Sequence, residues 1–168
     1  MSAERRSVNI RNLEEKLGYR FKDTKLLDTA LTHPSFGGDH HVPHYQRLEF
    51  LGDAVLELAV SRYLFFELPE VDEGKLTRIR AALVREETLC RAAKRIGLGE
   101  CIRLSVGEER SGGRNKPSIL ADVMEAVFAA VYLDGGFDAA VAVIRHALSD
   151  ELKPETLEDH LEAKSRLQ

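Results

Sequence analysis

Two pairs of acidic residues lie in stretches of sequence that are otherwise strongly apolar. Glu49 and Asp53 are four residues apart, and Asp122 and Glu125 are three apart. At about 100° per residue, each pair lies on one face of a helix, one turn apart. Thirteen of the fifteen residues in 119–133 are apolar, so we expect this helix to be buried. Acids on a buried helix need a compensating partner, because a charge is costly away from water.

Three kinds of partner could compensate these acids. Arg or Lys from another segment could pair with them, the acids could share protons as a general acid/base dyad, or they could bind hard divalent cations. Four carboxylates on two helices favour cations, because an i,i+4 pair facing an i,i+3 pair makes a compact oxygen cage for two metals about 4 Å apart. The Glu-x-x-His pattern of di-iron bundles is absent from both segments, which argues against redox iron.

Helical periodicity extends over most of the sequence and predicts an all-α domain. Gly18 is predicted to end a first helix, and Asp23 and Ser118 are predicted N-caps. Residues 35–44 are predicted to be a loop, residues 99–117 irregular, and residues 101–104 the one β-like stretch. The other predicted helices cover residues 25–31, 45–66, 75–84, 86–96, 118–133 and 139–148.

Composition and length indicate one soluble globular domain. The chain has 168 residues, of which 43% are hydrophobic and 31% charged, and no apolar run is long enough to span a bilayer. Cys90 and Cys101 form no CxxC motif, which favours small buried hydrophobes in a reducing cytoplasm. His40, His41 and His44 are interpreted as a surface loop rather than a Zn²⁺ or Ni²⁺ site, and His33 as a packing or capping residue.

The net charge of -4 conceals a basic middle segment. Residues 74–116 hold eleven Lys or Arg against five acids, whereas the chain from residue 134 onward is acidic. This distribution fits either a surface that faces a phosphate backbone or ordinary solvated helix faces.

Four motifs, in order along the chain, resemble those of the ribonuclease III family. Residues 47–56, RLEFLGDAVL, resemble the family signature; ALTHPS at 30–35, DEGKLT and RAALV within 72–84, and SILADVMEA at 118–126 resemble its neighbours. The resemblance implies an all-helical, homodimeric endonuclease domain that cuts double-stranded RNA with Mg²⁺, for which Mn²⁺ can substitute. It also implies products with a 5′-phosphate, a 3′-hydroxyl and two-nucleotide 3′ overhangs.

The resemblance assigns roles to the acidic pairs. Glu49, Asp53, Asp122 and Glu125 match the family's metal-binding carboxylates. Asp122 and Glu125 are its most critical pair, which would position the metals and the attacking water. Asp53 and Glu125 are the residues we expect to be catalytic.

Other positions match the family with less specific signals. Glu73 matches a further acid of the family's catalytic cleft. Phe50 matches an aromatic residue that packs into the partner subunit, and an ordinary core role fits Phe50 as well. Gln46 stands where many members have Glu, and an amide is a weaker metal ligand. The candidate RNA backbone contacts are Gln46, Lys75, Thr77, Arg78, Arg80, Arg114 and Lys116.

The resemblance also predicts the domain organisation and the biological role. Residues 1–153 would form the nuclease domain, and residues 154–168 the start of a connector to an absent double-stranded-RNA-binding domain. The expected role is cytoplasmic processing of ribosomal RNA precursors and other transcripts, including mRNA. Two rivals are a domain of this fold that binds RNA or protein without cutting, and a helical nucleotide phosphohydrolase. The second would need His-Asp ligand pairs, which the sequence lacks.

Overall fold

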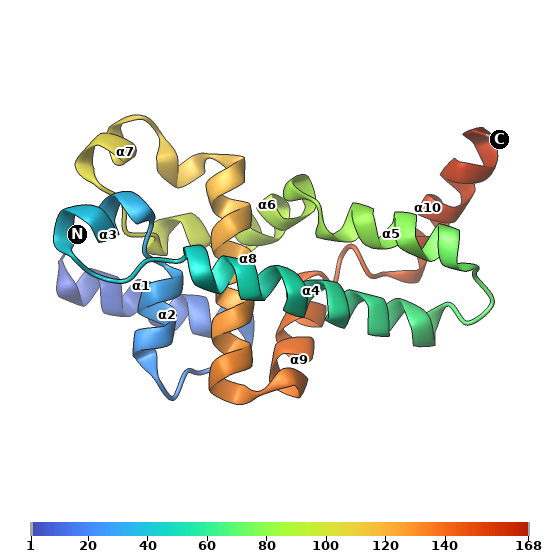
Figure 1. The fold of residues 1–168 in the computed structure, drawn as a ribbon, viewed down its shortest axis with the longest axis horizontal. Helices are drawn as coiled ribbons and strands as arrows, with labels where there is room; N and C mark the ends of the chain where they lie inside the picture. The colour runs from blue at the N-terminus through green and yellow to red at the C-terminus, as the bar shows by residue number, and fades with distance from the viewer. Residues whose placement is uncertain (1, 168) are drawn as a thin grey trace.

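The fold is built around one central helix, α8, which is buried along most of its length. The computed structural model describes the backbone of residues 2–167 and the side chains of residues 2–162. Helix α4 crosses α8, and further helices surround this pair (Figure 1). The helices that pack against α8 (Pro117–Gly135) are α2 (Thr24–Ala30), α4 (Gln46–Glu67), α6 (Glu86–Arg95) and α9 (Phe137–Ala147). The prediction of an all-α domain is confirmed for the described residues, which contain no strand.

The remaining elements extend the fold on either side of the α4–α8 pair. Helix α5 packs on α4 and α10 on α5, while α1 packs on the short helix η1. No helix within residues 2–167 is both long and apolar enough to cross a bilayer. These outer elements are α1 (Ala3–Leu17), α3 (Pro34–His40), α5 (Glu73–Val84), η1 (Leu98–Cys101), α7 (Val106–Arg110), η2 (Gly113–Asn115) and α10 (Pro154–Leu167).

Several predicted helix ends are confirmed by the backbone. Gly18 closes α1 in the left-handed conformation with φ 74°, and the Asp23 side chain accepts a hydrogen bond from the Lys25 N–H at the start of α2. The predicted connector, residues 154–168, falls on α10; its role stays a prediction, and Gln168 lies outside the described residues.

Two prolines begin helices, one where the sequence analysis predicted a loop and one just before the predicted N-cap Ser118. Residues 35–44 were predicted to be a loop, yet α3 starts at Pro34, and His33 caps it by accepting a hydrogen bond from Ser35 N–H. Ser118 is likewise not an N-cap, because α8 starts one residue earlier, at Pro117. Both prolines occupy the first helical turn, where the missing N–H costs nothing. The capping role predicted for His33 is confirmed.

The stretch from 99 to 117 is more regular than predicted. It contains most of η1, then α7 and η2, joined by short turns. The β-like signal at residues 101–104 does not correspond to a strand; only an isolated bridge joins Arg103 to Thr32. That bridge still ties the segment to the end of α2, since Arg103 N–H donates to the Leu31 carbonyl at 2.8 Å.

The crossing of α4 and α8 depends on a glycine. Gly52 is buried in the middle of α4, and a Cβ atom placed there would overlap the carbonyl group of Glu125 on α8. A side chain at this position would therefore force the two helices apart, and with them the acidic residues on each.

We predict that Gly52→Ala destabilises the fold by about 3 kcal/mol, because the gain in helix propensity is smaller than the cost of separating two packed backbones. Gly38→Ala is the matched control: Gly38 also lies in a helix, but nothing stands within 4 Å of its Cβ position. We expect Gly38→Ala to be neutral or stabilising by about 0.5–1 kcal/mol in urea unfolding. Equal effects of the two substitutions would contradict this view of the crossing.

Candidate metal centre

The helix crossing brings three of the predicted carboxylates together. Glu49 from α4 and Asp122 and Glu125 from α8 each offer a carboxylate oxygen, and these oxygens lie within 4.8 Å of one another. All three side chains are partly buried. Asp53, one turn after Glu49 on α4, is more exposed and contacts Glu125 through a hydrogen bond. We call these four residues the carboxylate cluster.

The pKa values of Glu49, Asp122 and Glu125 are raised, and burial is the largest cause for each of them. Burial, followed by the charge of Asp122 and a hydrogen bond with it, raises the pKa of Glu49 to about 7. Burial, followed by a hydrogen bond with Asp53 and the charges of the other acids, raises the pKa of Glu125 to about 8. Burial also raises the pKa of Asp122. Acids that hold protons at neutral pH lack a compensating positive charge.

Ion pairing does not explain the carboxylate cluster. Within the described side chains, none of the four acids forms a salt bridge with Lys, Arg or His. Proton sharing or a bound cation remains. The donor set consists only of carboxylate oxygens, the ligands that Mg²⁺ and other hard cations prefer, and a cation would relieve the repulsion that now raises these pKa values. The residues present therefore fit a divalent ion.

Glu73 lies apart from the carboxylate cluster in this chain. It occupies the first turn of α5 and is exposed, at the edge of a hollow of about 350 Å³ between α4 and α5. The residues that line this hollow are Ser61, Leu64, Phe65, Glu73, Leu76, Thr77 and Arg80.

The predicted RNA contacts differ in how free their side chains are. Lys75, Thr77 and Arg78 lie on α5 and form no ion pair within the described residues. Arg80, by contrast, donates to Ser61 Oγ at 2.9 Å and lies 3.8 Å from the Glu57 carboxylate. Gln46 is exposed at the start of α4.

Arg114 and Lys116 hold the α7 region together. The Arg114 guanidinium donates to the carbonyls of Gly99 and Ile102 at 2.7 and 2.8 Å and pairs with Glu109. Lys116 pairs with Glu108 at 2.9 Å. These internal contacts give both residues a structural role that charge counting along the sequence does not reveal.

Phe50 is not part of the core of this chain, because its side chain is 83% exposed. Leu58 and Phe65, also on α4, are 57% and 67% exposed. Helical spacing places all three on one side of α4, next to the side that carries Glu49 and Asp53. We call Phe50, Leu58 and Phe65 the apolar stripe.

Two residues at the site escaped the sequence analysis. Gly52 lies inside the family signature, and an isolated glycine in an apolar helix signals close packing. Tyr45 precedes α4 and lies one turn before Glu49; burial and the charges of Asp122, Glu49 and Glu108 raise its pKa well above the ordinary value. Its spacing of four from Glu49 was the available signal. The histidines 40, 41 and 44 form no metal-binding group within the described residues.

We predict that, with divalent ions chelated, the carboxylate cluster makes the fold less stable as pH rises from about 5 to about 8.5. The raised pKa values mean that the folded chain binds more protons than the unfolded chain in this range. Loss of those protons on raising the pH therefore favours unfolding. Glu125→Gln removes one such group, so its melting temperature should match the parent's near pH 5 and exceed it by roughly 3 °C near pH 8.5.

Glu70→Gln, which changes an exposed acid remote from the cluster, is the control and should follow the parent at both pH values. Thermal unfolding in EDTA measures all three proteins. Other titrating groups, such as His33, contribute equally to the melting temperatures of all three proteins, so their effect cancels in the comparison. A parent that matches Glu125→Gln at high pH would contradict the raised pKa of Glu125.

Comparisons with known proteins identify the family of this chain. A family profile described as Ribonuclease-III-like matches residues 23–152. Ribonuclease 3 of Variovorax paradoxus is 52% identical over 143 residues, which are 84% of this chain and 61% of that protein. Ribonuclease 3 of Geobacillus kaustophilus is 42% identical over 168 residues, which are 98% of this chain and 68% of the relative. The chain thus spans about three fifths to two thirds of the length of these relatives.

A solved structure shows the same fold. The nuclease domain of ribonuclease III from Campylobacter jejuni superposes with a TM-score of 0.80 at 44% identity, covering 85% of this chain and 98% of that domain. That structure is described as showing flexibility in a region involved in dimer formation. The profile match and the identities over most of the chain establish the family. This chain belongs to the ribonuclease-III-like family.

Proposed function

We propose that this chain hydrolyses double-stranded RNA with divalent metal ions, Mg²⁺ first and Mn²⁺ as a substitute. The observation that carries the proposal is the carboxylate cluster. Oxygens of Glu49, Asp122 and Glu125, from two crossing helices, lie within 4.8 Å of one another, and no cationic side chain among the described residues forms an ion pair with them. The enzymes named ribonuclease 3 among its relatives support this activity.

The chemistry follows from the ligand set. Glu49, Asp53, Asp122 and Glu125 would hold the ions, which supply charge neutralisation at the scissile phosphate and an acidified water. Asp53 and Glu125, which touch each other, are the pair we assign to catalysis. Asp53 is the more exposed of the two, and we propose that it faces the RNA. Hydrolysis would leave 5′-phosphate and 3′-hydroxyl ends.

RNA contacts are proposed on α5, with Gln46 at the start of α4 as a further contact. Lys75, Thr77 and Arg78 are the predicted contacts on α5 whose side chains carry no ion pair within the described residues. Basic side chains of this kind bind the phosphate backbone without reading sequence. Arg80, Arg114 and Lys116 contribute less directly, since each already pairs with an acid of its own chain. Ribosomal RNA precursors and other transcripts in the cytoplasm are the substrates we propose.

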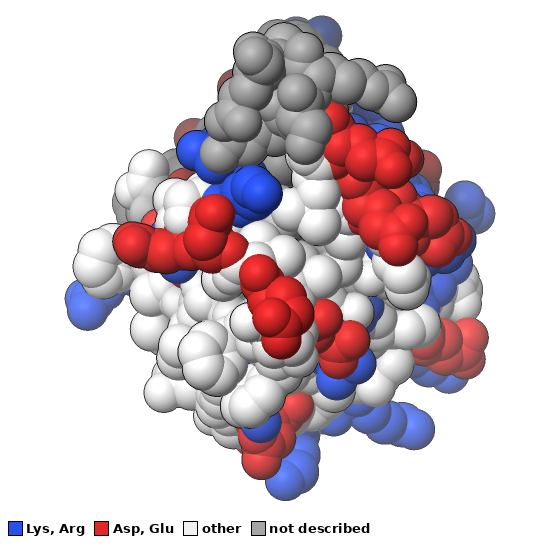
Figure 2. Space-filling view, turned by 90° about the vertical axis from the view of Figure 1, so that its right-hand side faces the viewer, with Lys and Arg blue, Asp and Glu red and all other residues white. Residues whose placement is uncertain are grey.

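We further propose that two copies associate through the apolar stripe. Exposed Phe50, Leu58 and Phe65 form an apolar face that a monomer rarely leaves open. The hollow between α4 and α5 offers a site for the partner's Phe50. Figure 2 shows the end of the molecule where α4 and α5 join: uncharged surface lies between acidic groups, some of which stand near the centre of this face. A two-fold pair would place one carboxylate cluster near each RNA strand and give staggered cuts with two-nucleotide 3′ overhangs.

We predict that the parent chain cuts a labelled RNA duplex at low salt when Mg²⁺ is present and that EDTA abolishes cutting. Glu125→Gln should lower the cleavage rate by about 10³-fold or more, because it removes a charged ligand at the centre of the cluster. Glu70→Gln should cut like the parent. A parent that binds the duplex but leaves it intact would favour the alternative, a domain of the same fold that binds RNA or protein without cutting.

We predict that Phe50→Asp disrupts the dimer. A charge at the centre of an apolar interface should weaken association by about 30-fold, equivalent to about 2 kcal/mol. Val106→Asp is the matched control, because Val106 is 68% exposed but lies on α7, away from the apolar stripe. Sedimentation equilibrium measures the association constants. Dimers unaffected by Phe50→Asp would place the interface elsewhere.

A further inference from the structure

His33 uses one ring nitrogen as the acceptor that caps a helix. The residue is partly buried at the N-cap of α3, and its Nδ1 accepts the N–H of Ser35 at 3.0 Å. A backbone N–H can only donate, so Nδ1 must carry a free electron pair. The geometry therefore requires a neutral ring that has its proton on Nε2.

Ser35 extends this contact to the residue that precedes α7. Its Oγ lies 2.8 Å from His33 Nδ1 and accepts the N–H of Ser105 at 3.0 Å. Because Oγ is the acceptor for Ser105, its own proton is free to point at Nδ1. Ser105 is in turn the N-cap of α7, where its side chain accepts the Glu108 N–H at 3.1 Å. The starts of α3 and α7 are thus joined by one chain of hydrogen bonds that ends at the His33 ring.

The backbone and the ring of His33 are held in place by other contacts. Its N–H donates to the Arg103 carbonyl at 3.0 Å. Its ring packs edge-on against the ring of Tyr45, with centroids 5.7 Å apart. Tyr45 is only 4% exposed, and its N–H donates to the Thr32 carbonyl at 3.0 Å. A ring flip that presents Nε2 in place of Nδ1 would disturb this packing, so the chain depends on Nδ1 as the acceptor.

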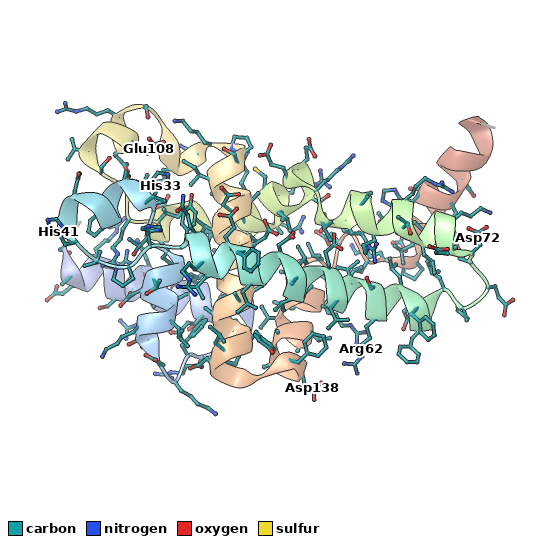
Figure 3. The ribbon with its side chains drawn as sticks, viewed as in Figure 1. His33, His41, Arg62, Asp72, Glu108 and Asp138 are labelled. Carbon is teal, nitrogen blue, oxygen red and sulfur yellow. The ribbon has the colours of Figure 1, made fainter. Side chains whose placement is uncertain are left out.

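The surroundings of the ring favour its neutral form. Burial is the largest effect and lowers the pKa of His33. Among the charged and titratable groups around the ring, Glu108 and Asp122 act against burial, whereas Lys116 and His44 act with it. Glu108 lies near His33 (Figure 3), but Lys116 already pairs with it at 2.9 Å. The Glu108 carboxylate is therefore not free to neutralise a charged ring.

We infer that His33 is a pH-sensitive link between α3 and α7, and that protonation of its ring opens the cap of α3 and loosens α7 from it. The added proton goes to Nδ1, so the Ser35 N–H loses its acceptor. The new Nδ1–H also competes with the Ser105 N–H for Ser35 Oγ. Helix α3 has only seven residues, and so short a helix depends on its cap.

The direction of the pH dependence follows from the neutral ring. The folded chain binds fewer protons at His33 than the unfolded chain does, because the cap holds Nδ1 unprotonated. The stabilisation by this link is therefore complete at about pH 7.5 and is lost as pH falls below the ordinary histidine value of about 6.5. The inference uses neither the carboxylate cluster nor the proposed function.

The test is His33→Asn, because an Asn side chain caps a helix with a neutral oxygen at every pH. Amide hydrogen exchange, followed by NMR, gives the protection factors of the Ser35 and Ser105 N–H groups at about pH 7.5 and about pH 5.5. In the parent, protection of both groups should fall by about 5-fold at the lower pH, the effect of losing one helix cap. In His33→Asn it should stay the same at the two pH values.

His41→Asn is the matched control. It makes the same chemical change at the other end of α3, at an exposed residue with φ 54°, a backbone conformation that Asn tolerates. Its Ser35 and Ser105 protection should fall with pH as in the parent. The N–H of Ala140 on α9, which donates to Gly136 at 3.1 Å, reports any change in the stability of the whole fold in each protein.

Nitrogen NMR of the His33 ring tests the inference in the parent alone, so the test survives if His33→Asn does not fold. At about pH 7.5 the ring should be neutral with Nδ1 unprotonated, and the protection of Ser35 should fall along the titration curve of the ring. A neutral ring with its proton on Nδ1 overturns the inference. So does Ser35 protection that does not follow the ring, or an equal loss of protection in the parent and in His33→Asn.

Discussion

The close approach of α4 to α8 at Gly52 is the constraint on which the rest of the structure depends. Because no side chain separates the backbones there, Glu49 on one helix reaches Asp122 and Glu125 on the other. The same contact forms the centre of the hydrophobic core, since residues on both sides of Glu125 in α8 are fully buried. The same helix contact therefore forms both the core and the carboxylate cluster. The favourable packing of the core offsets the repulsion between the acidic side chains.

The ion pairs of the described residues all lie outside the carboxylate cluster and leave its repulsion uncompensated. Arg95 pairs with buried Glu151, Arg80 with Glu57, and Arg114 with Glu109, all outside the cluster. A cationic side chain at the crossing would neutralise the acids permanently. It would also occupy the place where a metal ion could bind. The cluster instead holds protons, as the raised pKa values of Glu49 and Glu125 show, and protons can be exchanged for a divalent ion. Some of the basic residues in 74–116 are also neutralised by acids of their own segment, since Arg114 pairs with Glu109 and Lys116 with Glu108.

Local sequence patterns predicted the parts of the site that belong to a single helix. The spacing of Asp122 and Glu125 placed both on one side of α8, and the apolar residues around them predicted burial. The pattern could not reveal how closely Glu49 and Asp53 of α4 approach them, because that depends on the crossing point, which Gly52 sets. It also missed the starts at Pro34 and Pro117, since a proline that ends one segment equally well begins the next helix. Arg114 illustrates a third limit: net charge along a segment does not show which cations are consumed by internal contacts.

Three sides of helix α4 have different surroundings, and all three belong to one rigid helix. One side packs on α8, a second presents Glu49 and Asp53, and a third exposes Phe50, Leu58 and Phe65. If two copies associate through the apolar stripe as proposed, the partner would contact the same helix that carries Glu49 and Asp53. Tyr45 and Thr32 anchor the start of the helix, while Gly52 anchors its middle. An interface on another helix would lack that connection.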